Sequence, residues 1–76
     1  MNKLYTLIAE ALECNVNDIF TTKKISDIEE WDSLGQLSVL SALSDATEGK
    51  TDTLNLTNLE TIKELEDLLE KNNINL

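Results

Sequence analysis

Apolar residues near the start of the chain recur at helical spacing. Five of them follow the turns of a helix, with charged residues between them: Leu4, Leu7, Ile8, Ala11 and Leu12. This spacing predicts an amphipathic helix over about residues 2–14. Residues 15–17 interrupt the pattern. Val16, Ile19 and Phe20 then predict a turn of helix that folds back.

A long polar connection follows over residues 21–32, with the sequence TTKKISDIEEWD. Ile25 and Ile28 are its aliphatic members, and they are expected to anchor it in the core. The connection exceeds the usual length of loops in compact domains, and loops of this length are often functional.

The second main helix is predicted to begin at Ser33. Four leucines repeat at every third position after it: Leu34, Leu37, Leu40 and Leu43. On a helix this repeat drifts slowly around one face, with Val39 on its flank. Small polar side chains occupy the other side: Ser38, Ser41 and Ser44. The pattern fades near Gly49, which can adopt the left-handed conformation that ends a helix.

Two elements are predicted in the last third of the chain. Leu54, Leu56 and Leu59 are too closely spaced for a full helix and predict one short helical turn. Thr61 and Glu64 form a Thr-x-x-Glu capping box, which marks the start of the final helix. Four apolar residues form the stripe of that helix, which ends near Lys71: Ile62, Leu65, Leu68 and Leu69.

These elements predict an all-α fold, a small bundle of three main helices plus one short helix, in a single domain over residues 1–76. No helix can bury its apolar stripe alone, so the stripes must share one core. The chain has no proline and only two glycines, which also favours helices. Aromatic residues are scarce (Tyr5, Phe20, Trp31), so aliphatic side chains must form most of the core.

The net charge of −9 limits the possible partners. It repels the phosphates of nucleic acids and anionic membrane surfaces, so a protein partner with a basic contact surface is expected. Between residues 25 and 49 there are acids but no lysine or arginine: Asp27, Glu29, Glu30, Asp32, Asp45 and Glu48. Such a run is either a solvated surface or a recognition surface.

The composition argues against catalysis and metal binding. The chain has no histidine, which removes the usual general base, the Ser-His and Cys-His pairs and the usual zinc ligands. Cys14 is the only cysteine and stands next to Glu13, so it forms no intramolecular disulfide and nothing nearby activates its thiol. No catalytic residue is expected, and the protein is predicted not to be an enzyme. The start of the chain is too polar for a signal peptide or membrane span, so a cytoplasmic location is expected.

Ser33 has two interpretations, which are compatible. In the first, Ser33 and Gln36 form a Ser-x-x-Gln capping box, in which the hydroxyl accepts a hydrogen bond from the Gln36 amide. In the second, another enzyme modifies the hydroxyl, because no histidine or lysine stands beside it to activate it. A phosphate-bearing group would suit this position, since the free amides and the dipole at a helix N-terminus favour an anion.

The chain resembles the acyl carrier proteins and their peptidyl and aryl relatives over its whole length. The resemblance rests on its size and acidity, the amphipathic first helix, the long loop, an Asp-Ser-Leu motif (Asp32, Ser33, Leu34) and the closing segment LNLTNLETIKELEDLL. It implies that a phosphopantetheinyl transferase attaches the phosphopantetheine arm of coenzyme A to Ser33 as a phosphodiester. The thiol of the arm would hold acyl groups as thioesters, and a monomeric carrier would present them to other enzymes.

The resemblance also suggests where partners bind. The residues expected to be recognised lie around the motif: Glu29, Glu30, Trp31, Gln36 and Leu37. The expected partners are acyl-loading, condensing and acyl-transfer enzymes with basic contact surfaces. Trp31 could equally anchor the loop. Five apolar residues could line a cleft for an acyl chain or simply pack in the core: Leu34, Leu37, Leu40, Ile62 and Leu65.

The second helix departs from that of the fatty-acid carriers, because it has Gly35, Ser38 and Ser44 on the face where those carriers have acids. This thinned acidic surface favours a carrier dedicated to one pathway over a general fatty-acid carrier. The cargo that the resemblance implies belongs to a fatty-acid or a specialised acyl or polyketide-type pathway. A peptidyl, aryl or D-alanyl carrier loaded by an adenylating enzyme is the alternative within the family. An acidic helical adaptor that binds a basic protein is the alternative outside it.

Overall fold

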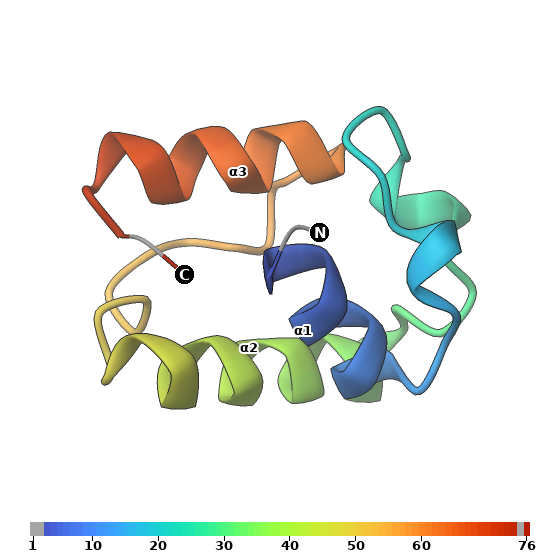
Figure 1. The fold of residues 1–76 in the computed structure, drawn as a ribbon, viewed down its shortest axis with the longest axis horizontal. Coiled ribbons are helices and arrows are strands. Elements are labelled where there is room, and N and C mark those ends of the chain that lie inside the picture. Colours follow the sequence, from blue (N-terminus) through green and yellow to red (C-terminus); the bar gives the residue numbers. More distant parts are fainter. Residues whose placement is uncertain (1–2, 75) are drawn as a thin grey trace.

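The structure, a computed structural model, describes residues 3–74 and 76. Its elements are three α-helices and two 3-10 helices: α1 (Lys3–Leu12), η1 (Val16–Asp18), η2 (Ile25–Asp27), α2 (Ser33–Thr47) and α3 (Ile62–Lys71). Figure 1 shows α2 and α3 along opposite sides of the molecule, and α1 packs against α2. Within the described ranges there is no β-strand, and no helix has the length and apolarity needed to cross a membrane. The predicted all-helical bundle is confirmed.

Aliphatic side chains form the core, as predicted. The buried apolar residues come from all three α-helices and from the connections: Leu4, Ile8, Ala9, Leu12, Ile19, Ile28, Val39, Leu43, Leu56, Ile62, Leu65, Leu69 and Ile74. The one tryptophan and the one tyrosine are only partly buried against this core. Removal of these aliphatic groups from water is therefore the main term that holds the helices together.

The buried face of α2 differs from the predicted one. Its buried residues are spaced by four: Gly35, Val39, Leu43 and Thr47. Four residues make slightly more than one helical turn, so this row stays on one side, whereas a spacing of three falls behind by a larger angle at each step. As a result Leu34 is 75% exposed and Leu37 is 62% exposed. Val39, which was assigned to the flank, is at the centre of the core.

The connection between α1 and α2 begins with η1. The side chain of Asn15 caps this short helix by accepting a hydrogen bond from the Asn17 N–H at 2.9 Å. Ile19 is buried behind it, which confirms the predicted turn of helix, but Phe20 is 43% exposed and does not join the core. Ile28 is buried and anchors the rest of the connection, as expected.

The short helix predicted around Leu54 to Leu59 is absent, because residues 50–59 form turns and bends. The side chain of Asn55 explains the difference. Its Oδ1 accepts hydrogen bonds from both the backbone N–H and the hydroxyl of Thr57, at 3.0 and 2.6 Å. A side chain that bonds the backbone two residues ahead competes with helical hydrogen bonding. Leu56 is nevertheless buried in the core.

The start of α3 and the end of α2 lie close to the signals predicted for them. Thr61 caps α3, and its hydroxyl accepts from the Glu64 N–H at 3.3 Å. The Glu64 carboxylate in turn accepts from the N–H of Glu60, one residue before the cap. At the end of α2 both Glu48 (φ 56°) and Gly49 (φ 83°) are left-handed, so the reversal begins one residue before the predicted glycine.

Backbone hydrogen bonds join the first connection to the start of α3. Lys24 and Thr61 form an isolated antiparallel bridge. Around it the Ile25 N–H donates to the Glu60 carbonyl at 2.8 Å, and the Ile62 N–H donates to the Lys23 carbonyl at 3.0 Å. These bonds fix η2 beside the last connection and so build one wall of the site described next.

Candidate functional site

Asp32, and not Ser33, caps α2. Asp32 has extended backbone angles, and its carboxylate oxygen accepts a hydrogen bond from the Gly35 N–H at 2.9 Å. The predicted bond from the Gln36 amide to the Ser33 hydroxyl is wrong, because Ser33 is already the first helical residue. Aspartate caps at least as well as serine and adds a negative charge at the positive end of the helix dipole. The exposed Ser33 side chain is therefore not needed as a cap.

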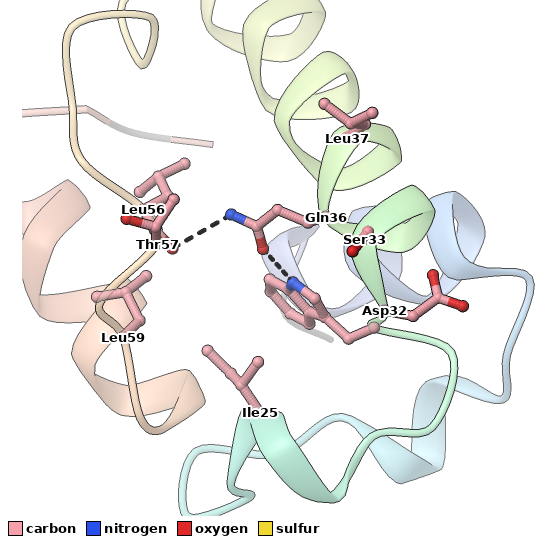
Figure 2. A pocket seen from close by; sticks show the side chains of 9 residues that line it. Ile25, Asp32, Ser33, Gln36, Leu37, Leu56, Thr57 and Leu59 are labelled. Carbon is pink, nitrogen blue, oxygen red and sulfur yellow. Dashed lines mark hydrogen bonds between the residues drawn. The ribbon is translucent and has the colours of Figure 1, made fainter.

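Gln36 has a different role from the one predicted. Its Oε1 accepts a hydrogen bond from the indole N–H of Trp31, and its Nε2 donates to the Leu56 carbonyl at 3.3 Å. Figure 2 shows this pair of bonds running from the start of α2 to the last connection. Gln36 thus ties the start of α2 both to the loop just before it and to the last connection, 20 residues further along the chain. Trp31 is half-buried against the core, which supports the interpretation that it anchors the loop.

An open depression of about 480 Å³ lies beside Ser33. Its lining comes from η2, the start of α2 and the last connection: Ile25, Trp31, Asp32, Ser33, Gln36, Leu37, Leu56, Thr57 and Leu59. Figure 2 shows Ile25 and Leu59 across the depression from Ser33. The volume falls within the range of small-molecule sites, roughly 300–1,000 Å³. The structure thus places the predicted acceptor hydroxyl at the rim of a site that could receive a small group.

Of the five apolar residues that could line an acyl cleft or pack in the core, only Leu37 lines the depression. Ile62 and Leu65 are fully buried, and Leu34 points outward without lining the depression. Four of its lining residues were not predictable as site residues from the sequence: Ile25, Leu56, Thr57 and Leu59. Ile25 lies in a 3-10 helix of one turn and the other three lie in an irregular connection, so no helical periodicity marked them.

Gly35 is a structural residue and not a vacant position in an acidic surface. It is buried, and a Cβ atom placed on it would lie 2.1 Å from the Glu30 carbonyl oxygen and 2.9 Å from a methyl group of Leu12. The loop before α2 therefore passes directly over the first turn of the helix. Ser44 is half-buried, which leaves Ser38 as the exposed member of the three positions that were compared with fatty-acid carriers.

The acidic residues expected to be recognised are on the surface near Ser33. Glu29 and Glu30 are exposed, and so is Asp32 of the predicted attachment motif. Two of these, Glu29 and Glu30, also line a smaller hollow of about 230 Å³ together with Asp18, Asp27, Ile28 and Lys23. No cluster of three or more potential ligands in the described part of the chain could hold a metal ion. The loop before α2 therefore presents negative charge beside an exposed hydroxyl.

Cys14 is not an alternative reactive group. Its side chain is half-buried, and this desolvation raises the pKa of the thiol, with further increases from the charges of Glu30 and Asp18. Both effects disfavour the thiolate, which is the reactive form. The prediction that Cys14 is a structural residue is consistent with this environment.

The site offers one exposed primary hydroxyl and no group that would activate it. Asp32 precedes Ser33, but its carboxylate bonds the helix backbone and points away from the depression in Figure 2. The sequence contains no imidazole. Comparisons with protein-family models, with curated proteins and with solved structures gave no match.

Proposed function

We propose that this protein is a carrier that holds its cargo on a phosphopantetheine arm attached to Ser33. One observation carries the proposal. Because Asp32 caps α2, the Ser33 hydroxyl is exposed on the first turn of a rigid helix, at the rim of the depression. The Asp32-Ser33-Leu34 sequence, which resembles the carrier motif, gives the same residue an independent reason to be the acceptor.

The attachment chemistry needs a separate transferase. The Ser33 oxygen attacks the phosphorus of coenzyme A that bears the pantetheine chain, and a P–O bond to serine forms. The bond between the two phosphates breaks, adenosine bisphosphate leaves, and the serine proton passes to a base on the transferase. This chain supplies the hydroxyl and a helix N-terminus that suits the phosphodiester anion. It contains no histidine to act as the base.

The tethered thiol explains how so small a protein would contribute to a pathway. A thioester on a flexible arm reaches successive partner enzymes at high effective concentration, so the intermediate need not diffuse. Acyl groups of a fatty-acid or specialised pathway are the proposed cargo. A peptidyl, aryl or D-alanyl cargo would use the same arm and differ in the loading enzyme.

The proposed partners are the transferase and the acyl-loading, condensing or acyl-transfer enzymes. Glu29 and Glu30 are exposed beside Ser33, which favours basic contact surfaces on these enzymes. Leu34 and Leu37 add exposed apolar surface on α2, the helix that begins with Ser33. The cytoplasmic location and the monomeric state stay predictions.

The exposed pair Leu34 and Leu37 also favours a second candidate function, a non-covalent adaptor that binds a basic protein through α2. Such an adaptor would require no modification of Ser33. The two functions therefore differ in one measurable quantity, the mass of the protein after exposure to a transferase.

The test is incubation with coenzyme A and a promiscuous phosphopantetheinyl transferase, followed by intact mass measurement. We expect the wild type to gain the mass of one phosphopantetheine and Ser33→Ala to gain none. Ser38→Ala is the matched control, because Ser38 is an exposed serine of the same helix and this variant should be modified fully. A known carrier in the same reaction verifies the transferase. If the wild type gains no mass, or if Ser33→Ala is still modified, the proposed function is wrong.

A further inference from the structure

We propose that the pantetheine arm itself rests in the depression beside Trp31, instead of extending into solvent. This inference rests on the proposed attachment at Ser33. It concerns the arm and not the cargo. In the rested state the chain nearest to the phosphodiester would cover Trp31, and a partner enzyme would have to lift the arm away before reaching the thiol.

Proximity favours the arm as the occupant. Ser33 lines the depression, so the atoms bonded closest to its oxygen are those best placed to enter. In the attached group the phosphate comes first and the pantoyl part of the arm follows it directly, whereas the cargo is bonded at the far end. A tethered chain also enters an adjacent site without losing the translational freedom that a free ligand would lose.

The lining matches the chemistry of pantetheine, in which apolar carbons alternate with amides. Ile25 and Leu59 offer aliphatic surface for the dimethyl carbon of the pantoyl group. Gln36 offers a polar contact: its amide nitrogen has two hydrogens, and the bond to the Leu56 carbonyl uses one of them. The second N–H can donate to an amide carbonyl of the arm.

The hydrogen bonds of Gln36 and the buried core favour an occupant of the depression that stays at the surface. Gln36 bridges from Trp31 to the Leu56 carbonyl across this region. Ile62 and Leu65 of α3 are packed in the core with almost no exposed surface. A long acyl chain would have to displace core side chains to enter the bundle, and such repacking is unfavourable in a dense interior. An arm lying over the surface requires no such change.

Trp31 provides the measurement, because it is the only tryptophan in the chain and it lines the depression. We would compare acrylamide quenching of its fluorescence in unmodified protein and in protein that mass measurement shows to be fully modified. Covering a half-buried indole should lower the quenching constant roughly twofold. An acetyl group added to the thiol should cause no further change, because the cargo lies beyond the depression.

A matched pair of variants tests the location. Leu37 and Leu34 are both exposed leucines of α2, but Leu37 lines the depression and Leu34 does not. In fully modified protein, Leu37→Ala should lose most of the protection of Trp31, and Leu34→Ala should keep it. Because both side chains are exposed, neither change should unfold the protein.

Each outcome separates this inference from the proposed function. If no mass is gained, the proposed function fails. If the protein is fully modified but quenching is unchanged, the arm lies in solvent and the inference alone is wrong. If quenching falls only after acylation, the cargo occupies the depression and the inference is again wrong. Equal effects of Leu37→Ala and Leu34→Ala would also overturn the assigned location.

Discussion

Replacement of Asp32 by alanine should lower the stability of the fold, whereas replacement of Ser33 by alanine should abolish modification and leave the stability almost unchanged. Asp32→Ala removes the capping bond to the Gly35 N–H, which is 2.9 Å long. Loss of such a cap costs about 1 kcal/mol, and loss of a negative charge at the helix N-terminus costs about 0.3–1 kcal/mol more. Since Asp32 is exposed, the charge should contribute at the lower end of this range, and we expect about 1.3–1.5 kcal/mol in total.

Ser33→Ala should leave the free energy of unfolding unchanged or raise it by up to about 0.5 kcal/mol, because alanine has the higher helix propensity. The variant should nevertheless lose all modification by the transferase. Asp32→Asn is the matched control for the cap, since asparagine keeps an oxygen that accepts from Gly35 and removes only the charge. Its stability should lie between those of the wild type and Asp32→Ala.

The assay is urea-induced unfolding followed by the far-ultraviolet circular dichroism of the helices. With a urea slope of about 1 kcal/mol per molar for so small a domain, Asp32→Ala should lower the midpoint by about 1 M. A larger loss of stability in Ser33→Ala than in Asp32→Ala would refute the reasoning, because it would return the cap to Ser33. The Ser33 hydroxyl would then be hydrogen-bonded as the cap and less available for attachment.

Three further predictions concern the rest of the molecule. Gly35→Ala should lower the free energy of unfolding, although alanine gains about 1 kcal/mol in helix propensity. The reason is that overpacking against Glu30 and Leu12 costs roughly 1–3 kcal/mol, and the closest contact is with backbone. Equal or greater stability in urea would refute this prediction. The melting temperature should rise from low to moderate salt, since a net charge of −9 is self-repelling, and flat melts would contradict it. Burial and the hydrogen bond to Glu66 raise the pKa of Tyr5 above 10.0, so the phenolate absorbance should titrate above that value and the free energy of unfolding should fall as pH rises through this range. Tyr5→Phe should remove that part of the loss of stability. A phenolate midpoint at or below 10.0 would contradict the assignment.

The helices with strong periodicity and clear caps were predictable from the sequence. The start of α3 was marked by Thr61, whose capping bond is present, and α1 lies within the predicted range. The inward face of α2 was not predictable from its leucines, because Leu34 and Leu37 carry the more obvious pattern while a glycine begins the buried row. Gly35 gives no hydrophobic signal, although it decides how closely the preceding loop approaches.

The candidate site was predictable in its central residue but not in its surroundings. Ser33 was identified from the motif, but the cap was assigned to it because serine and aspartate, adjacent in the sequence, are both good capping residues. The depression depends on Ile25 and Leu59, which meet only in the folded chain. Likewise, Asn55 replaced an expected helical turn through a local side-chain bond that spacing alone does not reveal.

The bridge between Lys24 and Thr61 has a consequence for the order of folding. The two residues are separated by the whole of α2 and the connection after it, so their pairing closes a large loop and loses chain entropy that only later contacts recover. The N-terminal half, synthesised alone, could form α1 and the cap of α2, but it would lack the partner that fixes η2. A nascent or truncated chain that ends just before residue 60 would therefore contain every residue that lines the depression but lack the backbone bonds that fix its walls. A transferase that requires the complete surface would then modify only finished molecules.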